Sequence, residues 1–204
     1  KTHEQSALAQ VSVFRGGCTL EAAEAVVDLE SFEEAPWVMD VVEALVDHSL
    51  LRRVEPHPGH VRFRMLESIR AYAAEKLGEA AAPTALRHAK HFASFGTESF
   101  LESLDTHGGV DRLKILALEL ENLLAGVDEG LATGEWEAAA GCALMAAELF
   151  ETYGPFLTAS RCWIGPWSSR MAAGTRGGCL TGLADRRPLL HSPSPRERGR
   201  TRKP

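Results

Sequence analysis

The pattern of apolar and polar side chains changes its period within residues 61–77. Over residues 61–65 apolar side chains alternate with arginines, which is the period of two expected for a half-buried strand. The apolar members are Val61, Phe63 and Met65, and the polar members are Arg62 and Arg64. From Leu66 to Leu77 the apolar residues lie three and four positions apart, as on one face of a helix. The pattern predicts a strand that continues into a helix, with Leu66 in the apolar face.

Three helices are predicted before this strand. The first covers residues 6–14 and stops at a Gly-Gly pair, and the second follows Thr19, a residue type that caps helix N-termini. The third begins at Pro36 and ends near Ser49. Strands at residues 50–55 and 61–65 flank a proline- and glycine-rich turn, which is typical of a hairpin. Three helices followed by a hairpin predict a winged helix over residues 1–80.

The next part of the chain, residues 84–161, has the periodicity of helices alone. One helix is expected from about Thr84, a long one from Asp111 to Leu131, and another over residues 136–153 with Phe150 and Tyr153 facing inward. The last two are joined by a short turn and are rich in small residues, as in an antiparallel helical-repeat unit of the tetratricopeptide (TPR) type. A further helix is expected from Pro155. The predicted fold class is therefore mainly α: a winged helix followed by the start of a TPR-like array.

Charge divides the chain at a different place. The net charge is −6, but residues 1–160 hold 12 Lys and Arg against 26 Asp and Glu, whereas residues 161–204 hold 10 against 2. Residues 162–204 also contain six Gly and five Pro and have no sustained apolar period, which predicts a disordered basic tail. A nucleic-acid- or lipid-binding tail, a linker, and a shifted reading frame would each explain it. We favour the shifted frame, because the helical pattern and the charge sign change together.

Composition also limits the location of the protein. The chain has no apolar run of the roughly 18 residues that a membrane span needs, and it opens on polar residues rather than a secretory signal. Because it lacks an initiator Met, we expect it to begin within a longer protein. Its four cysteines are scattered and form neither a metal motif nor a disulfide framework. We therefore expect a cytoplasmic protein without membrane contact.

No pattern of catalytic residues is visible, so we expect neither an enzyme nor a bound cofactor or metal ion. The sequence lacks the GxxxxGK[ST] loop that cradles phosphates. Two histidine pairs have metal-compatible spacing, but no further ligand completes either site, so we expect them to lie on the surface. These pairs are His57 with His60 and His88 with His91. Cys18 precedes a helix, where the pKa of a thiol can be lowered, but we prefer a buried structural role for it.

Contact with nucleic acid through the winged helix is disfavoured by charge. The third helix, which often enters DNA in this fold, exposes Asp40, Glu43 and Asp47, and phosphates would repel these carboxylates. The hairpin offers four arginines, for which a solvated strand face is the simpler expectation. They are Arg52, Arg53, Arg62 and Arg64.

Three segments together resemble one bacterial family, the signal-transduction ATPases with numerous domains. The segments are VSVFRGGCTLEAAEAV, VVEALVDHSLLRR and RFRMLESIRAYAAEKL. The resemblance implies that a winged helix follows an ATPase domain and precedes TPR-like repeats. In related switch proteins a Met-His-Asp motif at this position contacts bound ADP, and Met65, Leu66 and Glu67 occupy it here. Because a leucine cannot hydrogen-bond a phosphate, we expect Leu66 to act through packing.

The first functional hypothesis is therefore a non-catalytic regulatory and interaction fragment of such an ATPase. Its expected partners are the ATPase domain, further repeats, and a signalling protein or small-molecule inducer. The expected interdomain contacts are Arg62, Arg64, Met65, Leu66 and Glu67. The alternative is a stand-alone DNA-binding winged helix with a basic tail.

Overall fold

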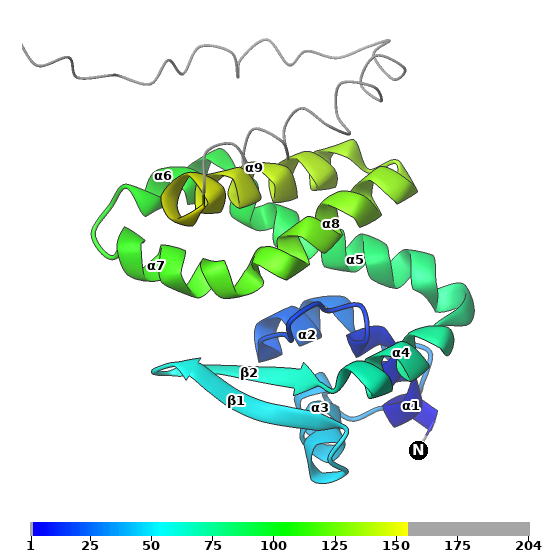
Figure 1. Cartoon of the computed structure of the whole chain (residues 1–204). Coiled ribbons are helices and arrows are strands. Elements are labelled where there is room, and N and C mark those ends of the chain that lie inside the picture. Colours follow the sequence, from blue (N-terminus) through cyan, green and yellow to red (C-terminus); the bar gives the residue numbers. More distant parts are fainter. Residues whose placement is uncertain (1, 155–204) are drawn as a thin grey trace, which may run out of the picture. The chain divides into compact units, whose positions relative to one another are not determined.

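The computed structural model describes residues 2–154 of the 204-residue chain. These residues are mainly helical and contain a two-stranded antiparallel sheet (Figure 1). None of their helices is long and apolar enough to cross a membrane. The expectations of a helix from Pro155 and of a disordered tail over residues 162–204 lie outside the described residues.

The chain opens with the three predicted helices, α1 (Thr2–Val11), α2 (Leu20–Val26) and α3 (Val38–Asp47). The cap of α2 is confirmed, since the backbone N–H of Ala22 donates to Thr19 Oγ1 at 3.2 Å. The bounds of α1 were wrong: it begins before residue 6 and ends before residue 14. Residues 12–14 instead form a tighter turn, in which each N–H donates to the carbonyl three residues earlier.

Helix α3 has one buried face and one exposed face, as predicted. Val41, Val42 and Leu45 are buried. The helix ends in a Schellman motif: Leu50 N–H donates to the Leu45 carbonyl at 2.9 Å, and Ser49 N–H donates to the Val46 carbonyl at 2.8 Å. This motif places Ser49 in the left-handed region with φ 60°, where glycine is the usual residue.

The hairpin consists of β1 (Leu51–His57) and β2 (His60–Met65). Its turn is Pro58-Gly59, shorter than the five residues predicted, because Pro56 and His57 still belong to β1. The strand register shifts between Val54 and His57, which accommodates a proline that has no N–H to pair. The Glu55 carboxylate closes the turn by accepting the Gly59 N–H at 2.7 Å.

A short segment before α2 adds a third strand position beside β2. Cys18 N–H donates to the Phe63 carbonyl at 2.9 Å, and Phe63 N–H donates to the Cys18 carbonyl at 2.8 Å. Gly17 is required here for two reasons. Its φ is +97°, and a Cβ at this position would lie 2.6 Å from the Phe63 carbonyl oxygen. The turn over residues 15–17 is thereby held against the hairpin.

Helices and short 3-10 turns make up the rest of the described chain. In order they are α4 (Glu67–Glu75), η1 (Gly78–Ala80), α5 (Ala81–Ala93), η2 (Ser94–Gly96), α6 (Glu98–Leu104), α7 (Gly109–Leu116), η3 (Ala117–Glu119), α8 (Leu120–Thr133) and α9 (Trp136–Tyr153). Helix α9 has its predicted bounds, whereas α6 was not predicted. The single long helix expected from Asp111 is interrupted at η3, which carries Glu119 into the interior.

Helices α5, α8 and α9 pack side by side, and their buried side chains belong to the same hydrophobic core as those of the winged helix (Figure 1). Helices α8 and α9 are joined by a turn at Gly134 and approach closely through small residues. A Cβ at Gly126 would lie 2.7 Å from Cys142 Sγ. The buried face of α9 includes Cys142, Met145 and Leu149, but Tyr153 is exposed, contrary to prediction. Tyr153 is the last residue of α9, so its side chain lies at the edge of this packing.

The Ser49→Gly variant should be more stable than the parent. An L-residue in the left-handed region costs about 1–2 kcal/mol, and glycine removes that cost. We expect the free energy of unfolding, measured by urea denaturation, to rise by about 1 kcal/mol. Ser49→Ala, which keeps the strained φ, is the control; an equal gain there would contradict the explanation.

Candidate functional site

The predicted contact residues at the junction of β2 and α4 are in different environments. Arg64 and Glu67 are exposed and Met65 is half-buried. Leu66 is 43% exposed, so its predicted place in the apolar face of the helix was wrong. Leu66 is the N-cap of α4 and has an extended backbone (φ −65°, ψ 142°), which turns its side chain away from the helical face.

Arg62 is only 3% exposed, so the expectation of a solvated arginine was wrong. Its guanidinium binds the Glu119 carboxylate through both terminal nitrogens, and Nη2 also donates to the Gly17 carbonyl at 3.0 Å. The face of β2 that carries Arg62 is therefore packed against residues 15–17 and against Glu119. Alternation correctly predicted that Arg62 and Phe63 lie on opposite faces of β2. Both faces of the strand are nevertheless in contact with protein here.

Asn122 extends this buried network. Its amide nitrogen donates to Glu119 Oε2 at 2.7 Å and to the Gly17 carbonyl at 3.0 Å. Its amide oxygen accepts the Arg15 N–H at 2.6 Å. The winged helix and the helical segment are thus joined by charged and amide hydrogen bonds, a connection that no local sequence pattern indicated.

His88 borders the same network and is completely buried, which corrects its predicted surface location. Its Nδ1 lies 2.6 Å from Glu129 Oε2, and its Nε2 lies 3.4 Å from Asn122 Oδ1. His57 and His60 pack edge-to-face at the hairpin turn, with ring centroids 5.5 Å apart. Among residues 2–154, no group of three or more His, Cys, Asp and Glu side chains could hold a metal ion.

Cys18 is buried, and its environment makes the thiol harder to deprotonate rather than easier. Loss of solvation raises the pKa of its thiol to about 12, although the nearby Arg62 charge acts to lower that pKa. The hypothesis of a thiol pKa lowered by the following helix was therefore wrong, and burial agrees with the structural role that we preferred.

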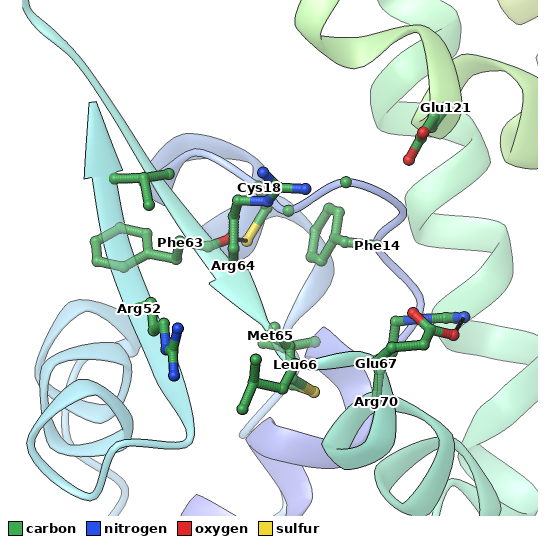
Figure 2. A pocket seen from close by; sticks show the side chains of 14 residues that line it. Phe14, Cys18, Arg52, Phe63, Arg64, Met65, Leu66, Glu67, Arg70 and Glu121 are labelled. Carbon is green, nitrogen blue, oxygen red and sulfur yellow. Dashed lines mark hydrogen bonds and ion pairs between the residues drawn. The ribbon is translucent and has the colours of Figure 1, made fainter. Parts of the chain in front are cut away.

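A pocket of about 420 Å³ opens beside the junction (Figure 2). Figure 2 shows the arginines of the hairpin on one side, the Glu67–Arg70 pair of α4 below, and Glu121 of α8 across from them. Arg70 Nε donates to Glu67 Oε2 at 2.9 Å, and this hydrogen bond lowers the pKa of the Glu67 carboxyl. The pocket brings together Arg64, Met65, Leu66 and Glu67, whereas Arg62 lies outside its lining.

The solvent-facing side of α3 is a separate surface with negative charge. Asp40, Glu43 and Asp47 are exposed along it, as predicted. Two large apolar side chains stand at its N-terminal end: Trp37 is 83% exposed and Met39 is 45% exposed. Periodicity predicted the buried face of α3, but it gave no sign of exposed aromatic surface.

Comparisons with known proteins agree with this architecture. Residues 1–78 match the family model described as a winged helix-turn-helix domain. Over 129 residues the chain is 33% identical to proteins named "Putative HTH-type transcriptional regulator" in Mycobacterium tuberculosis strain H37Rv and Mycobacterium bovis. The match covers 60% of this chain but spans only 14% of the length of those relatives. No solved structure matches at comparable significance. The match to residues 1–78 agrees with the order of three helices and a hairpin that these residues form.

Glu119→Ala should strongly destabilise the protein, because it leaves the Arg62 charge buried without its partner. We expect the free energy of unfolding to fall by about 3–5 kcal/mol in urea denaturation. Glu67→Gln is the matched control: it breaks the solvent-exposed pair with Arg70, which water and salt screen, and should leave the free energy of unfolding nearly unchanged. Similar losses in the two variants would show that the buried pair has no special role.

Proposed function

We propose that this chain is a non-catalytic regulatory module of a transcriptional regulator, and that its winged helix acts by contacting protein surfaces. The main support is the charge of α3, the second helix of the helix-turn-helix. In DNA-binding members of this fold that helix lies in the major groove between two rows of phosphates. Here its outer face presents three carboxylates.

The negative charge extends well beyond α3. Residues 16–51 contain nine Asp and Glu and no Lys or Arg. Affinity for DNA depends on cations that replace the counterions of the phosphates, and this surface has none to offer. The same surface, with exposed Trp37 and Met39 beside the carboxylates, has the mixed character of a protein-contacting surface.

The wider context of the proposal rests on the sequence resemblance. An ATPase domain in the parent protein would contact the junction at Arg64, Met65, Leu66 and Glu67, and residues 84–161 would begin a TPR-like array. The packing of α8 against α9 through small residues supports the repeat assignment. The long remainder of the relatives leaves room for such domains. A signal would act by shifting the balance between two domain arrangements.

DNA binding through the hairpin is the second candidate. Arg52, Arg53 and Arg64 are exposed, and the names of the mycobacterial relatives favour a DNA-linked role. In this case the hairpin rather than α3 would meet the phosphates. The basic residues 161–204 would add affinity that does not depend on sequence.

Fluorescence anisotropy with labelled duplex DNA separates the two candidates. We expect the full chain with Arg52, Arg53 and Arg64 all replaced by Gln to bind DNA as the parent does, at both about 50 and about 200 mM salt. Any binding that both proteins share then belongs to other parts of the chain. Salt-sensitive binding that disappears in the triple variant would overturn the proposal and establish the hairpin as a DNA contact.

A further inference from the structure

The pocket at the junction is lined by both charged and apolar side chains. Arg52 and Arg64 line it on the hairpin side. Phe14, Val54 and Leu66 add apolar surface to its lining. Its volume of about 420 Å³ is within the range of pockets that hold small organic molecules.

Arg52 and Arg64 stand directly opposite each other on the antiparallel strands. Both are exposed, and within residues 2–154 neither forms an ion pair with a carboxylate. Like charges at directly opposite positions destabilise a sheet, so this arrangement costs free energy. An anion bound by both side chains would reduce that cost.

The carboxylates that line the pocket do not form ion pairs with Arg52 or Arg64. Glu67 is held by Arg70 through two hydrogen bonds. Glu67 raises the pKa of the Arg70 guanidinium through this bond, and the charge of Glu121 adds to the increase. Glu67 therefore pairs with Arg70 on the α4 side of the pocket, and Glu121 lies on the α8 side. The hairpin side keeps its positive charge.

The concave shape argues for a small ligand rather than for DNA. Gly16 and Gly17 line the pocket next to the hairpin, and Glu121 of α8 lines it across from the hairpin (Figure 2). A Cβ at Gly17 would lie 2.8 Å from Arg64 Cγ, so the stem of Arg64 packs directly on this turn. A duplex would need a protruding surface, whereas a small planar carboxylate can bind a guanidinium through two parallel hydrogen bonds. Figure 2 shows the two guanidiniums directed toward different ends of the pocket, so the exposed side chains of Arg52 and Arg64 would turn toward a shared carboxylate on binding.

We propose that this pocket binds a small organic carboxylate whose carboxylate group lies between Arg52 and Arg64 and whose apolar body lies against Phe14, Val54 and Leu66. The ligand would contact the winged helix on one side and α8 on the other, so it would act on the connection between them. This inference goes beyond the proposed function, and it assigns Arg64 and Leu66 to a ligand that would compete with an ATPase domain for these residues.

Titration of the full chain with benzoate, followed in two-dimensional ¹H–¹⁵N NMR spectra, tests the proposal. Saturable shifts are expected at the hairpin and at the start of α4. Benzamide, which has the same shape without the charge, should produce none. Inorganic phosphate, which lacks the apolar body, should bind more weakly than benzoate. Binding of phosphate as tight as that of benzoate would overturn the role of the apolar wall.

Variants of the three exposed hairpin arginines provide the specificity test. Arg52→Gln and Arg64→Gln should each weaken benzoate binding about tenfold, which corresponds to about 1.4 kcal/mol. Arg53→Gln is the matched control: Arg53 is on the other face of the same strand, opposite Phe63, and its loss should leave the affinity unchanged. Equal weakening in all three variants, shifts confined to residues 161–204, or no saturable shifts at all would overturn the proposal. None of these readouts involves DNA, so failure here is distinct from failure of the proposed function.

Discussion

The buried ion pair between Arg62 and Glu119 fixes how β2 meets the later helices, beside a hydrophobic core that both parts share. Removing two charges from water costs several kcal/mol for each ion, and the cost is recovered only when the geometry is good and the remaining hydrogen-bonding atoms are satisfied. Both conditions are met. The guanidinium meets the carboxylate in a two-pronged contact, and Gly17 and Asn122 supply further partners. A lysine, with a single ammonium group, could not make the same set of bonds.

This pair also determines which charges of the winged helix remain available to partners. Of the two arginines that share one face of β2, Arg62 is used internally and Arg64 is left on the surface. Arg64 and Arg52 then form a positive site beside the junction, while α3 presents a negative face elsewhere on the winged helix. Two surfaces of opposite sign allow one small domain to meet two kinds of partner, and neither surface resembles a basic helix built for the major groove.

Local pattern was sufficient for elements whose environment is simple. The buried and exposed faces of α3 and the bounds of α9 follow from period and from the residues that flank each helix. Long-range contacts decided the rest. No glycine or proline marks the break at Ala117–Glu119, and the break is explained only by a partner 57 positions earlier in the chain. The same holds for the burial of Arg62 and His88, because alternation tells which side chains share a face but not what covers that face.

The contacts of Asn122 join positions far apart in the order of synthesis. Its side-chain amide forms hydrogen bonds with the backbones of Arg15 and Gly17, which are 107 and 105 residues earlier in the chain. A ribosome therefore releases the whole of residues 1–78 before the groups that neutralise Arg62 exist. Until then the guanidinium stays hydrated, and the turn at residues 15–17 lacks its anchor. The segment that matches a domain by sequence is thus smaller than the set of residues whose contacts complete it, which extends at least to Asn122.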